Sequence, residues 1–417
     1  MNAPAARPLL PLDEALQRLA EGAAPHRITG TEAVSTFDGL GRVLAAEVVS
    51  RLDVPPADNT SMDGYAMRAA DVPAPGTLLP VSQRIPAGVV GAALQPGTAA
   101  RIFTGAQVPP GADAVVMQEL CEAVAGEGLG AVRVHEVPAV GQWVRRRGED
   151  VRRDAAVLAP GLRLTPQALG LAASVGSATL TVLRRPRVAL FSTGDELVMP
   201  GEPLKPGAIY NSNRFTLRAL FQAAGCEVGD LGIVPDRLDA TREALRRAAQ
   251  DHDLVVTSGG VSVGEEDHLR PAVEAEGTLQ HWQLAIKPGK PLAFGSVRRT
   301  DGSAALFVGL PGNPVSSFIT ALLCARTVLR ALQGQPAALP AALPLRADFD
   351  WPKPDRRREF LRVRLNEAGG LELFDNQGSG VLTSVVWADG LADNPPGQAI
   401  RRGDTVRFLP MSALIAS

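Results

Sequence analysis

The chain has 417 residues, of which 45% are hydrophobic and 21% charged, a length and composition that suit roughly two to four globular domains. Its 42 basic and 44 acidic residues give a formal net charge of −2, so no overall field favours nucleic acid or an anionic membrane. Three scattered cysteines, Cys121, Cys226 and Cys324, are too few for a disulfide framework or a zinc site, and we expect inert core thiols.

The N-terminal part predicts a short helix followed by a β-rich unit. Residues 1–11 lack the pattern of a signal peptide and no run of about 18 apolar residues occurs, which predicts a cytoplasmic protein without a membrane span. Apolar residues recur at helical spacing from Leu12 to Ala20. From about Arg51 the chain is rich in Pro, Gly and Val, with alternating pieces such as 131–137, and a helical pattern returns at 166–173. If the two flanking helices pack together, residues 51–142 form an inserted β-rich domain within a discontinuous helical domain of residues 1–50 and 143–183.

The next segment predicts an α/β domain over residues 184–333. Short apolar runs indicate strands, and amphipathic stretches indicate helices between them. The strands are expected at 188–192, 227–233, 254–258, 291–295 and 304–309, and the helices at 214–224, at 241–250 and from Pro314 onwards. This alternation predicts a doubly wound, mostly parallel sheet.

A third domain is expected at the C-terminus, over residues 334–417. The stretch 334–344 has the Pro- and Ala-rich composition of a semi-rigid linker. Beyond it, the alternating patterns at 359–365 and 406–410 predict a small β-barrel or sandwich.

Four loops of the α/β domain carry small, acidic and basic residues. They are Ser192–Glu196, Ser258–Asp267, Lys287–Pro291 and Pro311–Pro314, and three of them follow an apolar strand. Because loops at the carboxyl ends of parallel strands meet in one crevice, these four loops predict a binding site.

Each loop suggests a chemistry and leaves a plainer reading open. The glycines and serines of 258–264 let backbone amides approach a phosphate, and Glu265–Asp267 suggest bound Mg²⁺, although these acids could equally be the first turn of a helix. Lys287 and Lys290 flank a Pro-Gly turn and could hold a small oxyanion or lie on an ordinary surface turn. Pro314 suits the first position of a helix, whose free N–H groups favour an oxyanion, but a simple corner has the same pattern.

Seven ordered motifs from about residue 10 to the end resemble the MoeA/gephyrin E-domain family of molybdopterin molybdenumtransferases. The motifs are Asp58–Ala66, Arg101–Val116, Ser192–Glu196, Asn211–Asn213, Ser258–Gly264, Lys287–Pro291 and Leu310–Pro314. The resemblance implies a homodimer of four domains, including an inserted β domain, a doubly wound domain related to molybdopterin adenylyltransferases and a C-terminal β-barrel. It also implies a Mg²⁺-dependent reaction in which molybdenum from molybdate enters adenylylated molybdopterin and AMP is released.

The same resemblance assigns catalytic residues. Asp236 and Asp267 match acids associated with Mg²⁺ and the pyrophosphate, and Glu196 matches a further acid that could also bind the metal. Asp63 and Thr104, from the β-rich insert, match residues that the family supplies to this cleft from the partner subunit.

The resemblance assigns the remaining site residues to molybdate and the nucleotide substrate. They are Ser192, Thr193, Ser258, Gly259, Gly260, Ser262, Lys287, Lys290, Pro291, Asn313, Ser316, Arg357 and Ser379. Gln283 stands where some bacterial relatives have a lysine, so that outer cation is not expected here.

Other functions stay open at this point. A molybdopterin adenylyltransferase would share the doubly wound domain, but the Ser258 loop continues into Val-Ser-Val-Gly, unlike that family's Thr-Gly-rich loop. A non-enzymatic scaffold would need a fused partner domain or a long linker, and a nucleotide- or pterin-binding regulator could keep the fold without turnover. Expected partners are the small-molecule substrates, a second copy of the chain, and transfer contacts with an adenylyltransferase and acceptor molybdoenzymes, but neither nucleic acid nor membrane.

Overall fold

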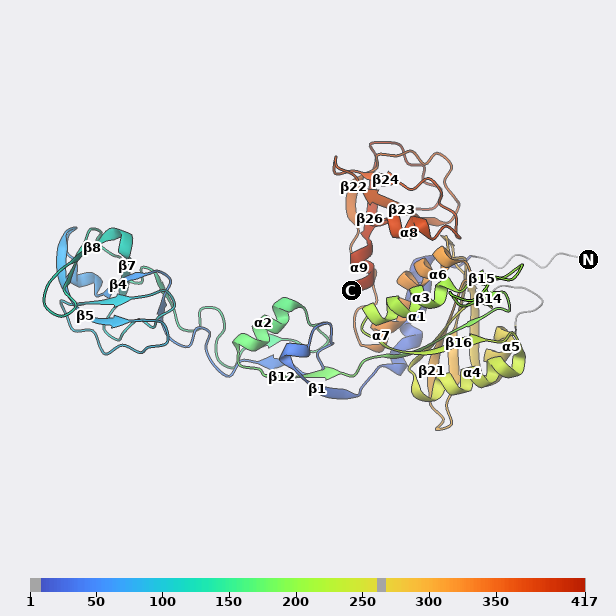
Figure 1. The fold of residues 1–417 in the computed structure, drawn as a ribbon, viewed down its shortest axis with the longest axis horizontal. Coiled ribbons are helices and arrows are strands. Elements are labelled where there is room, and N and C mark those ends of the chain that lie inside the picture. The colour runs from blue at the N-terminus through green and yellow to red at the C-terminus, as the bar shows by residue number, and fades with distance from the viewer. Residues whose placement is uncertain (1–8, 261–267, 417) are drawn as a thin grey trace, which may run out of the picture. The chain divides into compact units, whose positions relative to one another are not determined.

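The computed structural model describes residues 9–260 and 268–416 and divides into two compact units. The α/β unit comprises Met1–Glu32 with Leu183–Ser417, and the insert unit comprises Ala33–Val182. Figure 1 draws both units and labels many of their elements. Two predicted site residues, Ser262 and Asp267, lie outside the described residues.

A six-stranded sheet forms the centre of the α/β unit, with strand order β16, β13, β17, β21, β20, β18. The first four strands are parallel, and β20 and β18 are antiparallel to their neighbours. Their bounds are β16 Glu227–Val234, β13 Arg187–Thr193, β17 Leu254–Ser258, β21 Ala304–Leu310, β20 Pro291–Arg298 and β18 Gly277–Gln283. The predicted mostly parallel sheet is therefore confirmed. Strand β18 was not predicted, because its mixed composition fits an edge position with little buried surface.

Helices cover both faces of this sheet because successive residues of a strand point to opposite sides. Val188 and Leu190 of β13 share one core with helices α1, α3, α6 and α7, while Ala189 and Phe191 share another with α4 and α5. The helix bounds are α1 Leu12–Ala23, α3 Ser212–Ala223, α4 Leu238–Asp251, α5 Leu269–Glu276, α6 Pro314–Thr320 and α7 Arg326–Leu332. The doubly wound arrangement follows.

A single long helix runs from Pro314 to Leu332, in which a π-helical turn at Ala321–Ala325 joins α6 to α7. Its 19 residues are long and apolar enough to cross a membrane, but 83% of its most apolar window is buried inside the protein. It is thus the core helix of the α/β unit. Side chains of α7 also bond the following segment, since Arg330 Nε donates to the carbonyl of Pro336 at 2.6 Å. The predicted linker at 334–344 is therefore held against the helix, and its last two residues belong to strand β22.

The C-terminal β domain is a six-stranded sheet around its own core. The strand order is β19, β23, β25, β26, β22, with β24 paired to β23. The bounds are β19 Ile286–Lys287, β23 Arg358–Leu365, β25 Gly390–Asn394, β26 Thr405–Pro410, β22 Leu343–Arg346 and β24 Leu371–Leu373, with short helices α8 Thr383–Trp387 and α9 Met411–Ala416. Strand β19 comes from the lysine turn of the α/β domain, so this sheet joins the two domains directly.

The insert unit contains a third six-stranded sheet, in the order β7, β4, β6, β5, β9, β8, with a small core on each side. The bounds are β7 Ala114–Met117, β4 Gly64–Met67, β6 Ala99–Ile102, β5 Thr77–Ile85, β9 Ala131–Val134 and β8 Cys121–Val124. The two chain segments that flank this sheet in sequence pair with each other in three short two-stranded sheets. These are β3 Asn59–Thr60 with β10 Val144–Arg145, β2 Val48–Val49 with β11 Ala156–Leu158, and β1 Thr31–Ser35 with β12 Thr179–Leu183. The β-rich insert is thus present.

Helix α2 (Pro166–Ser174) begins at Thr165, whose side chain accepts a hydrogen bond from the N–H of Ala168. It packs in the insert unit, whereas α1 packs in the α/β unit. The two helices that flank the insert therefore lie in separate cores, and the four-domain division remains a prediction.

The cysteines differ in their surroundings. Cys226 and Cys324 are buried, as expected, whereas Cys121 on β8 is only half-buried. Burial raises the pKa of the Cys121 thiol to about 11 and that of Cys324 to about 12.

Candidate active site

A cavity of about 660 Å³ lies at the carboxyl ends of the parallel strands, between the α/β and C-terminal β domains of one unit. All four predicted loops contribute to its wall. The predicted site residues that line it are Thr193, Glu196, Ser258, Gly259, Lys287, Lys290, Pro291, Asn313, Ser316, Arg357 and Ser379. The convergence expected for loops at this edge of the sheet is therefore observed.

The floor of the cavity is formed by the ends of β13 and β17. Ser192 and Ser258 are register partners, and their hydroxyl oxygens lie 3.3 Å apart. Ser192 is fully buried beneath the cavity and supports Ser258, which lines it. Gly259 has a φ of +92°, and a Cβ there would lie 2.9 Å from the carbonyl oxygen of Thr193, so the chain can pass this point only as glycine. Gly260 follows with a φ of +63° but is not among the lining residues.

The Asn211–Asn213 motif has a structural explanation. The Oδ1 of Asn211 accepts a hydrogen bond from the N–H of Arg214 and caps helix α3. The Nδ2 of Asn213 donates to the carbonyl of Gly312 at 2.7 Å and holds the Pro311–Pro314 loop. Both Asn213 and Gly312 line the cavity.

The lysine turn packs against the core helix. Gly289 lies between the two lysines with a φ of +108°, and a Cβ there would lie 2.3 Å from the Oγ1 of Thr320. Lys287 points its Nζ to Glu359 Oε1 at 3.2 Å and to Asp355 Oδ2 at 3.6 Å. Lys290 is exposed and makes no ion pair within residues 9–260 and 268–416. The two lysine amines look equivalent in the sequence, but their electrostatic surroundings differ. Only Lys287 has its charge neutralised by acidic partners among the described residues.

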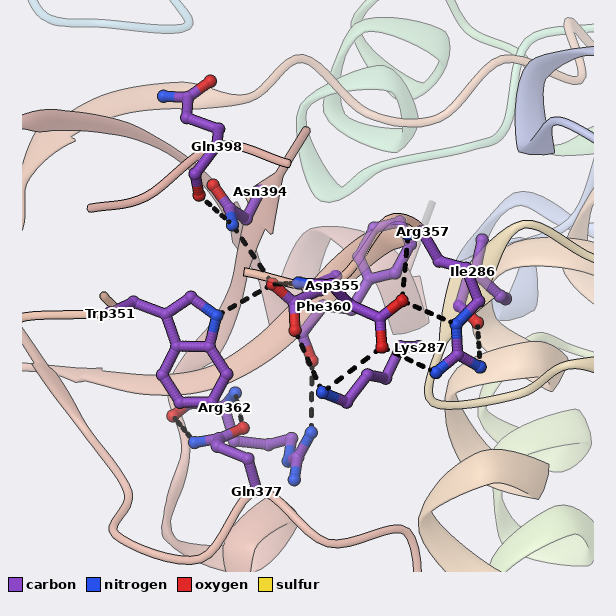
Figure 2. A network of polar contacts seen from close by, with 11 residues as sticks. Ile286, Lys287, Trp351, Asp355, Arg357, Phe360, Arg362, Gln377, Asn394 and Gln398 are labelled. Atoms are coloured by element: carbon purple, nitrogen blue, oxygen red, sulfur yellow. Dashed lines mark hydrogen bonds and ion pairs between the residues drawn. The ribbon is translucent and has the colours of Figure 1, made fainter. Parts of the chain in front are cut away.

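A buried carboxylate organises this wall (Figure 2). Glu359 is fully buried, and its Oε2 accepts hydrogen bonds from Trp351 Nε1 at 2.8 Å, the N–H of Asp355 at 3.1 Å and Asn394 Nδ2 at 3.3 Å. The parallel pairing of β19 with β23 places Lys287 opposite Glu359. Sequence reasoning missed Glu359; its only signal is that it is the one acidic residue in a strand of apolar residues and arginines.

Arg357 is the cavity residue of the three consecutive arginines. Its Nε and Nη2 donate to the two carboxylate oxygens of Asp355, at 2.9 and 2.8 Å. These bonds hold the pKa of Asp355 far below its usual range and raise the pKa of Arg357. Arg358, the next residue, instead bonds Asp393 with Nε and Nη2 and is structural.

Ser379 joins the cavity wall to the start of the core helix. Its carbonyl accepts a hydrogen bond from the N–H of Val315 at 2.9 Å, and Ser316 lines the cavity beside it. Two hydroxyls, a guanidinium and an amine therefore face one volume, which suits a small oxyanion.

The predicted acids are only partly brought together. Glu196 is exposed on the cavity wall, but Asp236 is not among the lining residues, and its N–H donates to Asp195 Oδ1 at 3.4 Å. Asp267 falls in the segment that the structure does not describe. Across the described ranges, no three His, Cys, Asp or Glu side chains gather as a metal cluster. The residues present are nevertheless hard oxygen donors of the kind that Mg²⁺ binds.

Asp63 and Thr104 meet each other within the insert unit. The Oδ1 of Asp63 accepts hydrogen bonds from both Oγ1 and N–H of Thr104, each at 2.7 Å. These bonds lower the pKa of Asp63, with the Thr104 hydroxyl as the largest cause. Next to them, the Arg101 guanidinium lies over the rings of Phe103 and Tyr65, 4.5 and 5.2 Å from the centroids. Two motifs that are 41 residues apart thus form one polar group.

Comparisons with known proteins cover nearly the whole chain. Family models match the MoeA N-terminal region (domain I and II) at residues 10–176, a probable molybdopterin binding domain at 189–331 and the MoeA C-terminal region (domain IV) at 344–411. The molybdopterin molybdenumtransferase of Haemophilus influenzae is 37% identical over 98% of this chain and 100% of its own. Molybdopterin molybdenumtransferase 2 of Mycobacterium tuberculosis is 38% identical over 85% of this chain and 88% of its own. The crystal structure of the molybdopterin biosynthesis MoeA protein from Pyrococcus horikoshii OT3 matches with a TM-score of 0.81 and 30% identity, over 96% of this chain and 99% of that one.

Proposed function

The chain belongs to the MoeA family of molybdopterin molybdenumtransferases, and from this premise we propose that it inserts molybdenum from molybdate into adenylylated molybdopterin with release of AMP. It is a transferase of molybdenum cofactor biosynthesis. The observation that carries the proposed reaction is the cavity, because it joins a glycine-rich strand edge to a wall of cations and hydroxyls.

The cation wall is the proposed molybdate subsite. Molybdate is a dianion, and charge-assisted hydrogen bonds from an amine and a guanidinium are the strong contacts for such a ligand. We assign Lys290, Arg357, Ser316 and Ser379 to this contact, with Lys287 held beside them by Glu359. Fixed donors of this kind also stabilise negative charge that develops during transfer without reorganising.

The strand-edge loops are the proposed site of the adenylylated substrate. Thr193, Ser258 and Gly259 offer hydroxyl and backbone groups at the place where ligands bind in open α/β sheets. Asn313 completes that side of the wall, whereas Pro291 belongs to the oxyanion pocket with the two lysines. A substrate that extends from the strand-edge loops to the cation wall would bring its dithiolene next to the bound molybdate.

We assign Mg²⁺ to the carboxylates Glu196 and Asp236, with Asp267 as the third acid outside the described residues. When bound, Mg²⁺ would neutralise the charge of the pyrophosphate link. The role of these acids is to hold the metal against the pyrophosphate, while the amines hold the oxyanion.

We further propose a cytoplasmic homodimer in which Asp63 and Thr104 act on the cavity of the partner subunit. The hydrogen bonds from Thr104 orient the Asp63 carboxylate and lower its pKa. A mixture of two inactive variants, Asp63→Asn and Asp267→Asn, tests this arrangement. Recovered activity supports sites shared between subunits, and no recovery with well-folded heterodimers contradicts it. Contacts with an adenylyltransferase and acceptor molybdoenzymes belong to the same proposal.

The decisive assay is AMP release from purified adenylylated molybdopterin with Mg²⁺, with and without molybdate. We expect molybdate-dependent release by the intact protein and loss of release in Asp267→Asn. Glu274→Gln, an exposed acid of α5 paired with Arg270, is the control and should behave as the wild type. Tight substrate binding without release would refute the enzyme assignment and favour a scaffold. AMP transfer from ATP to molybdopterin would favour an adenylyltransferase.

A further inference from the structure

Arg362 is a fully buried cation on strand β23, with an exposed fraction of 1%. Its Nε donates to Ser384 Oγ at 3.1 Å, Nη1 to the carbonyl of Phe360 at 3.2 Å and Nη2 to the carbonyl of Gly378 at 3.3 Å. All three acceptors are neutral. Burial lowers the pKa of Arg362 to about 10, so the guanidinium is still charged at neutral pH.

The other arginines of β23 are compensated, and Arg362 is not. Arg358 pairs with Asp393, and Arg364 pairs with Glu372. In the part of the chain that the structure describes, no carboxylate pairs with Arg362. Buried charges are normally paired because their desolvation is costly. A buried cation without an acidic partner therefore calls for a negative group that arrives from elsewhere.

Arg362 is hydrogen-bonded to a loop that lines the cavity, and Figure 2 shows its contact with Gln377. The Gln377 side chain accepts from the N–H of Arg362 at 2.9 Å and donates to its carbonyl at 3.1 Å. Gln377 and Gly378 both line the cavity, and Ser379 follows them. The residue thus fixes the loop 377–379 through both its backbone and its guanidinium.

The charges at the front of this wall cancel. Lys287 and Arg357 are matched by Asp355 and Glu359, which contact them directly. Among the described residues of this wall and the loop behind it, Lys290 and Arg362 are then the cations without an acidic partner. An oxyanion bound in the cavity would compensate this positive charge.

We propose that Arg362 is a positioning residue for the oxyanion subsite: it holds the loop 377–379 in place and supplies the fixed positive charge that a bound dianion compensates. The proposal rests on the proposed function for naming the dianion as molybdate, whereas the charge argument requires only a small oxyanion. Arg362 itself does not line the cavity and acts through the loop.

The test measures molybdate binding to the purified full chain by isothermal titration calorimetry, and KM for molybdate in AMP release. Arg362→Met removes the charge and keeps the volume, and we expect about tenfold weaker molybdate binding after screening by salt. Arg362→Lys keeps the charge and should stay within about threefold of wild type. Arg364→Met, two residues along the same strand and exposed, is the matched control and should leave binding unchanged.

The outcomes are distinct. Weak molybdate binding in Arg362→Met with rescue by Arg362→Lys, and unchanged affinity for the adenylylated substrate, supports a charge role rather than a general loss of structure. Wild-type affinity in a folded Arg362→Met overturns the proposal. Should Arg362→Met fail to fold, a loss of more than about tenfold in Arg362→Lys overturns it instead. Arg362-dependent binding without any AMP release by wild type would refute the proposed reaction and uphold this inference, and absence of molybdate binding by wild type would overturn the inference.

Discussion

Replacing Glu359 by Gln tests whether the buried carboxylate stabilises the wall of the cavity. The substitution keeps the size of the side chain but removes its charge and one acceptor. Glu359 accepts from Lys287 through one oxygen and from Trp351, Asp355 and Asn394 through the other. The new amide can keep its oxygen towards the three donors only by turning its NH₂ towards the Lys287 ammonium.

The expected cost follows from these contacts. Loss of the charge-assisted bond to Lys287 costs about 1.5–3 kcal/mol, and the remaining bonds weaken because their acceptor is neutral. Lys287 has 38% of its side chain exposed and can turn to solvent, which reduces the cost. We expect a net loss of about 2–3 kcal/mol in the free energy of unfolding of the α/β unit, and a melting temperature lower by roughly 5–10 °C.

Differential scanning calorimetry and urea denaturation at pH 7 measure this effect. Glu372→Gln is the control, because Glu372 is 39% exposed and pairs with Arg364 on the neighbouring strand of the same sheet. Such a surface pair contributes about 0–1 kcal/mol. The reasoning is refuted if Glu359→Gln destabilises the protein no more than Glu372→Gln does.

Three further predictions concern the lysine turn, the insert unit and the thiols. Gly289→Ala should lower the free energy of unfolding by about 2 kcal/mol or more and weaken molybdate binding, since its Cβ would meet Thr320. The calorimetric control is Gly302→Ala, because Gly302 also has a positive φ but nothing lies within 4 Å of its added Cβ. Equal losses of stability in the two variants would contradict the steric argument. Thr104→Val should move the pKa of Asp63 up towards 3.8, as read from its carboxyl ¹³C shift. Because the folded pKa of Asp63 is depressed, its contribution to stability is present above about pH 4 and is lost as the pH falls through the folded value. This acid-dependent loss of stability should be smaller in Thr104→Val. An unchanged dependence of stability on acidic pH in the variant would argue against this explanation. Cys324 should resist a thiol reagent at pH 8 until urea unfolds the protein, and rapid native labelling would contradict its burial.

Local pattern was enough to predict the scaffold of the α/β unit. The strands β13, β17 and β21 are short, nearly continuous apolar runs between turn residues, because a central parallel strand is buried on both faces. Loops that follow such strands must leave the sheet at the same edge, so the convergence of the Ser192, Ser258 and Pro311 loops follows from sequence order. The lysine loop instead follows β18, which the sequence did not predict. Ser258 and Asn313, which follow β17 and β21, line the cavity for this reason.

Pairing between strands far apart in the sequence determined the electrostatic surroundings of the site residues. Lys287 and Lys290 look equivalent in the sequence, but the β19–β23 pairing places Lys287 against Glu359, 72 residues away, and leaves Lys290 exposed. Sequence also cannot reveal that Arg362 is buried. Its strand alternates as if one face met solvent, yet Leu361 faces the core of the β domain while Phe360 packs into the core of the α/β domain.

The sequence by itself therefore determined the central strands and helices of the α/β domain, their order and the edge of the sheet where their loops gather, since these depend on periodicity and turn chemistry within a few residues. The tertiary structure decided which charges are neutralised and which are buried unpaired. The physical reason is that solvation and Coulomb energies depend on distances between segments far apart in the chain, such as β19 and β23, and no local pattern encodes those distances.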